Sequence, residues 1–73
     1  NFDVPQNGKI KMVIYDLMGR EVRTLMNHDL AAGYHTLTWD GKNNLGQIAS
    51  AGLYFCQLRG QHYTKTIKML LLK

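Results

Sequence analysis

The stretch over residues 9–25, KIKMVIYDLMGREVRTL, limits most strongly what this chain can fold into. Its residues Ile10, Met12 and Ile14 recur at every second position, which is the pattern of a β-strand with one buried face. Gly19 then interrupts the run, and glycine is the residue most able to adopt the positive φ of a tight turn. The stretch therefore predicts a β-hairpin. Because an isolated hairpin is at best marginally stable in water, further strands must cover its apolar face.

The rest of the chain has the same character, with short alternating runs separated by turn residues and no amphipathic helical period. We expect one all-β domain over residues 1–73, an immunoglobulin-like antiparallel β-sandwich of about seven strands. A connection over residues 27–32 should follow the hairpin. Outside the hairpin, the expected strands are residues 1–5, 34–40, 47–49, 53–59 and 63–72.

Several residues are predicted to be structural. Tyr54 precedes Cys56 by two positions, as in the tyrosine corner of immunoglobulin domains, where a buried ring satisfies a backbone group. Because Cys56 is the only cysteine, no internal disulfide can form, and we expect it to be a small buried hydrophobe. The predicted core is Ile14, Leu37, Trp39, Tyr54, Leu58 and Met69, and the predicted turn residues are Gly19, Asp40, Gly41, Gly46 and Gly52.

The formal net charge is +4, and the charges are distributed unevenly, because every acidic residue lies at or before Asp40. We interpret the basic second half as a solvated surface that keeps exposed strands from aggregating. No arginine cluster, recognition helix or RNA-binding aromatic motif supports a nucleic-acid partner. The longest apolar runs, residues 69–72 among them, are far shorter than the roughly 20 residues of a membrane-spanning helix.

No catalytic or metal-binding constellation is visible. His28, His35 and His62 follow no known ligand spacing, so we interpret them as surface histidines. The loop after Asp40 has one carboxylate and no glutamate to complete a calcium site, and Asp40 is expected to bond its own turn. Ser50 lacks a nucleophile elbow. We therefore predict no enzyme activity, no cofactor and no metal.

Five short motifs follow one another along nearly the whole chain, and together they resemble the C-terminal sorting domain of type IX secretion cargo. They are also similar to the related immunoglobulin-like domain of the flagellar hook-capping protein. The ending KMLLLK favours the sorting domain. The motifs are IYDLMGREVRTL (14–25), AGYH (32–35), WDGKNNLG (39–46), AGLYF (51–55) and KMLLLK (68–73).

The resemblance implies a non-catalytic domain that targets an exported bacterial protein to the outer-membrane translocon. Its implied partners are that secretion machinery, a sortase-like peptidase and an upstream cargo domain, with a final location at the cell surface or in the medium, reached through the periplasm. Since residues 1–5 hold only the tail of the family's first segment, we expect the chain to be a fragment of a larger exported protein. No membrane span is implied.

The last strand is the candidate for translocon recognition, because a basic strand near the chain end can add its edge to a receptor sheet. The candidate residues are Lys68, Met69, Leu70, Leu71, Leu72 and Lys73. Two other functions stay open: a structural or adhesive module like the hook-cap domain, and an accessory module of a secreted hydrolase. A carbohydrate-binding module needs an exposed aromatic platform, for which Tyr34 and Tyr63 are the only candidates.

Overall fold

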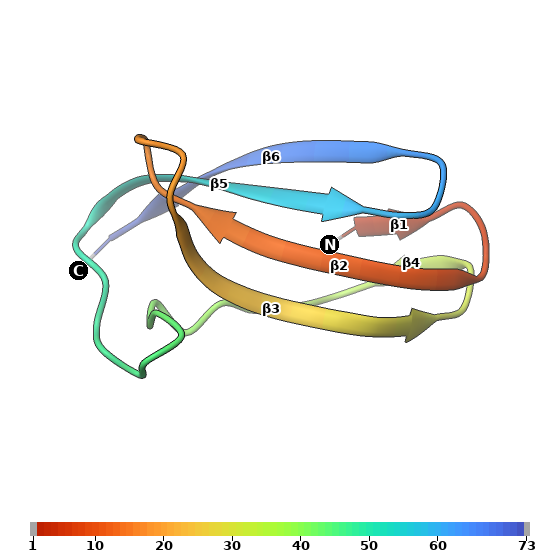
Figure 1. The fold of residues 1–73 in the computed structure, drawn as a ribbon, viewed down its shortest axis with the longest axis horizontal. Helices are drawn as coiled ribbons and strands as arrows, with labels where there is room; N and C mark the ends of the chain where they lie inside the picture. The colour runs from red at the N-terminus through yellow and green to blue at the C-terminus, as the bar shows by residue number, and fades with distance from the viewer. Residues whose placement is uncertain (1, 73) are drawn as a thin grey trace.

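A computed structural model of the chain describes residues 2–72 and shows an all-β fold in which every paired strand is antiparallel (Figure 1). The all-β class and the antiparallel pairing predicted from the sequence are thus confirmed. Within the described residues there are six strands: β1 (Phe2–Val4), β2 (Gly8–Tyr15), β3 (Glu21–Leu30), β4 (Gly33–His35), β5 (Gly52–Arg59) and β6 (Thr64–Leu71).

The predicted hairpin is present as β2 and β3, which pair antiparallel from Gly8–Leu30 to Tyr15–Glu21. Its turn closes through Asp16, whose amide donates to the Arg20 carbonyl at 3.0 Å, and Gly19 adopts a φ of 80° there. The expected connection over residues 27–32 is wrong in part, because β3 continues to Leu30. The reason is that β2 begins at Gly8 and offers a ladder partner along its whole length.

The strands form two sheets. The larger sheet has the order β3-β2-β5-β6, so β3 and β6 are its edges, and the smaller sheet contains only β1 and β4. In Figure 1 the larger sheet lies in front, with β1 and β4 behind it. Alternate residues of β2 and β5 point back toward the small sheet and form the core.

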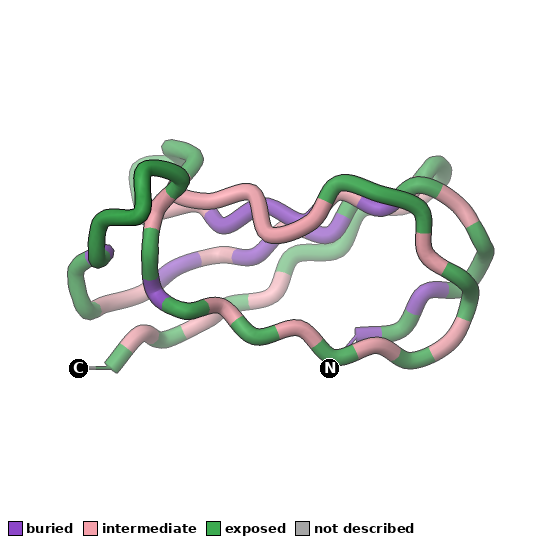
Figure 2. Tube along the Cα trace, turned by 90° about the horizontal axis from the view of Figure 1, so that it is seen from below, coloured by how far each residue is buried: buried purple, intermediate pink, exposed green. Residues whose placement is uncertain are grey.

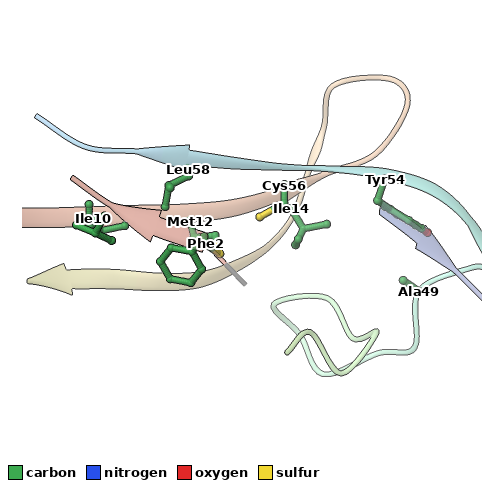
Figure 3. Close-up of a cluster of buried hydrophobic side chains, with 9 residues drawn as sticks. Phe2, Ile10, Met12, Ile14, Ala49, Tyr54, Cys56 and Leu58 are labelled. Carbon is green, nitrogen blue, oxygen red and sulfur yellow. The ribbon is translucent and has the colours of Figure 1, made fainter. Parts of the chain in front are cut away.

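The core lies between the two sheets and is apolar throughout (Figure 2). Figure 3 shows the inward side chains of β2 and β5 meeting Phe2 from β1, with Tyr54 beside Ala49 at the other end. Of the predicted core residues, Ile14, Tyr54 and Leu58 are buried, while the remaining three are half-buried around them. The buried cluster is Phe2, Val4, Ile10, Met12, Ile14, Ala49, Tyr54, Cys56 and Leu58, and its half-buried rim includes Leu37, Trp39 and Met69.

Two predicted strands are wrong in extent. The strand expected over residues 34–40 is confined to β4, although Leu37 and Trp39 still turn inward. The strand expected over residues 47–49 is reduced to a single bridge between Lys42 and Ile48. In the antiparallel β1–β4 ladder Phe2 pairs with His35 and Val4 with Gly33, so residues 37–40 continue past the Phe2 end of β1 and belong to none of the described strands. The described part of the chain therefore has six strands in place of about seven.

Candidate interaction surfaces

Tyr54 fixes the entry of the chain into β5. Its ring is buried, and its hydroxyl donates a 2.6 Å hydrogen bond to the carbonyl of Ser50, four residues upstream. This is the bond that the tyrosine-corner hypothesis requires. Trp39 meets the Tyr54 ring edge-on, with centroids 5.1 Å apart and an interplanar angle of 70°. The pair joins β5 to the segment that follows β4.

The loop over residues 40–48 is organised by its own side chains. Asp40 accepts the Lys42 amide at 3.0 Å, which is the local role predicted for it. Asn43 accepts the amides of Leu45 and Gln47 through one oxygen, at 2.9 and 3.0 Å. Gly41 and Gly46, both predicted structural residues, have φ values of 79° and 81°, in the left-handed region that favours glycine. Because side chains satisfy so many loop amides, the loop holds one shape.

Asn44 docks this loop onto β3. Its amide donates to the Val22 carbonyl at 3.0 Å, and its side-chain oxygen accepts the Thr24 amide at 2.9 Å. Its side-chain nitrogen also donates to a carboxylate oxygen of Glu21 at 3.0 Å. Unpaired backbone groups on a sheet edge invite other strands to add, and Asn44 covers this part of the β3 edge.

Asp16 holds the tip of the hairpin, a role that the sequence analysis did not assign. Its carboxylate accepts the amides of Met18 and Arg20 at 2.9 and 3.0 Å and pairs with the Arg20 guanidinium at 3.0 Å. The Arg20 amide bond, together with the Met18 amide and the Arg20 side chain, holds the pKa of Asp16 below its ordinary value. The sequence feature that indicates this role is an aspartate three residues before the turn glycine, Gly19.

The hairpin tip and the loop lie at the same end of the molecule, at the left of Figure 1. We call residues 16–20 and 41–51 the loop end. Its apolar side chains are unusually open to water: Met18 is 79 % exposed and Ile48 is 72 % exposed, and Leu17 and Leu45 are also exposed. Shallow hollows between the tip and the loop are lined by residues of both. The predicted structural residues Gly19, Asp40, Gly41, Gly46, Gly52 and Tyr54 lie in or directly beside this end.

The predicted recognition strand is the second edge of the large sheet. Among the described strands β6 pairs only with β5, and Lys68 and Leu70 point away from the core while Met69 and Leu71 point toward it. Leu72 follows the strand and is exposed. Lys73 lies outside the described residues.

The histidine, cysteine and acidic side chains that could form a metal or catalytic site lie apart from one another. Within residues 2–72, no three histidine, cysteine or acidic side chains gather as a metal site would require. His28 and His35 donate to the backbone carbonyls of Asp29 and Ala31, at 3.0 and 2.8 Å. Burial raises the pKa of the Cys56 thiol. None of the described residues belongs to a helix that could cross a membrane.

Comparisons with known proteins identify the family. The sequence model of the FlgD Ig-like domain matches residues 4–62. Two curated relatives, the basal-body rod modification proteins FlgD of Salmonella typhimurium (strain LT2) and of Salmonella typhi, are each 48% identical over 46 residues. That match covers 63% of this chain and 20% of each relative, so the chain spans about a fifth of their length. No solved structure matches the chain significantly. The matched residues include the whole hairpin, the loop and β5, and this chain belongs to the FlgD Ig-like domain family.

Proposed function

We propose that the chain is a non-catalytic, immunoglobulin-like β-sandwich module that joins its parent protein to a neighbouring protein in a larger assembly. Family membership supports a structural module of the hook-cap kind, because the relatives are named as basal-body rod modification proteins. This was the alternative in the sequence analysis, and it now takes precedence over the sorting function. The observation that carries it is the exposed apolar loop end.

The loop end has the two properties that a protein contact needs. Exposed apolar side chains gather there, and such patches on small domains commonly mark interaction sites. Their backbone is held by Asp16 in the tip and by Asn43 in the loop, so little ordering entropy is lost on binding. Its apolar character and its preorganised backbone both raise the affinity of such a surface for a partner protein.

A chimaera tests this proposal. Residues 1–73 replace the corresponding domain of the Salmonella typhimurium relative, in a strain that lacks its own copy, and hooks are scored by electron microscopy. We expect hooks to form, and we expect Met18→Ser to reduce them strongly at unchanged protein level. Tyr34→Ser is the matched control, since Tyr34 is 86 % exposed on β4, away from the loop end. Failure of the unmodified chimaera, or equal loss in both variants, contradicts the proposal.

The sorting function is the second candidate. Its supporting observation is that β6 presents an open edge with the exposed base Lys68. The secretion machinery and a sortase-like peptidase are then the partners, and the cell surface or medium is the destination. A periplasm-directed reporter ending in residues 1–73 should leave a host that has a type IX system. Lys68→Glu with Lys73→Glu should retain the reporter in the periplasm. If neither fusion leaves the periplasm, this candidate is eliminated.

A further inference from the structure

The face of the large sheet that turns away from the core is divided into an apolar half and a basic half. We call it the outer face, meaning the outward residues of β2, β5 and β6. It is the face toward the viewer in Figure 1, and none of the described strands covers it. Strand register, rather than sequence proximity, places its residues next to one another.

The apolar half surrounds Tyr15 and Phe55, which are direct partners across β2 and β5, and the exposed base Lys68 on β6 stands opposite Phe55 at the open edge of this row. Leu53 and Leu70 form the next row toward the loop end, and Leu70 is 64 % exposed. Val13 lies on this same face and is almost completely covered although no second sheet packs over it. The aromatic and aliphatic side chains thus form a continuous, half-open platform outside the core.

The basic half lies at the other end of the same strands. Lys11 on β2 stands directly opposite Arg59 on β5, and Lys9 is one outward position further along. The three bases line one surface hollow together with Asn27 and Gln61. Neither of the two ion pairs in residues 2–72 involves any of these three bases.

This placement does not serve the stability of the sheet. Like charges directly opposite each other on neighbouring strands are destabilising, and Lys11 and Arg59 are such a pair. Of the acids on this sheet surface, Asp29 on β3 stands opposite Lys9, and Glu21 is already bonded to Thr24 and Asn44. Neither acid is a strand partner of Lys11 or Arg59. An external carboxylate in the hollow would relieve the repulsion between the bases.

We propose that the outer face binds an acidic segment of another protein, whose apolar side chains cover Tyr15 and Phe55 while its carboxylates reach Lys11 and Arg59. Charge complementarity selects this partner over a second copy, because two chains of net charge +4 would bring basic halves together. The aliphatic residues Leu53 and Leu70 favour a protein partner over a nucleic acid. A nucleic-acid surface stacks bases on aromatic side chains and follows the backbone with a longer row of basic side chains. This surface is separate from the loop end, and the inference does not depend on the proposed function.

The test uses the purified chain and a short synthetic peptide of alternating glutamate and leucine, labelled for fluorescence anisotropy. We expect saturable binding that weakens with added salt, and amide shifts in two-dimensional NMR centred on β2 and β5. Lys11→Gln with Arg59→Gln should weaken binding by about tenfold or more. Lys42→Gln with Lys65→Gln is the matched control, because it removes the same charge from exposed positions off the outer face.

Several results would overturn the inference. Equal weakening by both variant pairs would mean that net charge alone attracts the peptide. Equally tight binding of a glutamate–serine peptide would show that the apolar half takes no part. Tighter binding of a short oligodeoxythymidine would identify a nucleic-acid surface instead. Absence of binding, or NMR shifts confined to the loop end, would also contradict it, and circular dichroism of each variant excludes loss of folding as the cause.

Discussion

At the scale of single residues, the hydroxyl of Tyr54 has a role that can be measured. It donates to the Ser50 carbonyl at 2.6 Å from a buried ring. Tyr54→Phe removes this donor and leaves the carbonyl without it, so we expect unfolding free energy to fall by about 0.5–1.5 kcal/mol. Urea unfolding of both proteins measures the difference. Tyr34→Phe is the matched control, because Tyr34 is exposed. An unchanged midpoint for Tyr54→Phe contradicts the corner.

The Cys56 thiol should be inert in the folded protein. It is buried in the core, and that burial raises its pKa. Because only the thiolate is nucleophilic, a raised pKa and a lack of access both slow its reaction. We expect a thiol reagent such as DTNB at pH 8 to modify Cys56 far more slowly in buffer than in denaturing urea. Equal rates in the two conditions would show that the core opens readily.

At the scale of elements, the hairpin turn should make stability depend on pH. The pKa of Asp16 is lowered in the folded state, so its carboxylate stabilises the turn above the ordinary carboxyl pKa of about 3.9. That contribution is lost as pH falls through the lowered value. Asp16→Asn should therefore have a lower urea midpoint than the unmodified chain at pH 7, and the two midpoints should approach each other in acid. A difference independent of pH contradicts this account.

The strands that were predicted correctly from the sequence are those whose alternating pattern is paired with a neighbouring strand in the structure. β2, β5 and β6 follow their period-2 alternation closely, whereas the burial of β3 does not alternate. Residues 36–40 keep the alternation, yet a ladder there needs a strand that continues past the Phe2 end of β1, which no local pattern specifies. Gly60, between β5 and β6, is a glycine for another reason, since a Cβ there would overlap the ring of Tyr63. That is a side-chain contact within the turn rather than a requirement for positive φ.

The candidate surfaces were less predictable than the strands. The turn chemistry identified Gly19, Asp40 and Gly46, but it could not show that the tip and the loop meet at one end. Lys11 and Arg59 are far apart in sequence and become neighbours only through the register of β2 against β5. The predicted recognition residue Lys68 was identified from charge, and its position on an open edge became visible only with the strand order.

At the scale of the whole molecule, the question is whether the loop and the sheet unfold together. The segment over residues 36–49 has a single bridge of its own, and it is attached to the rest by side chains and by the Asn44 amide, which donates to the Val22 carbonyl. Trp39 rests on Tyr54 and donates to the Lys42 carbonyl at 2.9 Å, and Asn44 bonds β3. Because these contacts attach the segment to the same core that the large sheet packs on, we expect the segment and the sheet to unfold in one cooperative transition. Trp39 fluorescence and far-UV circular dichroism should then give the same urea midpoint.

Asn44→Ala sharpens this prediction. The substitution removes the side-chain bonds to Thr24 and Glu21, which should lower the free energy of unfolding by about 0.5–1.5 kcal/mol. In a single cooperative unit that loss shifts both signals by the same amount, because the loop cannot detach without exposing the core. A fluorescence midpoint that falls while the circular-dichroism midpoint stays would show that the segment around Trp39 opens on its own. The loop end would then be ordered only by its partner, and its preorganisation could not contribute to binding.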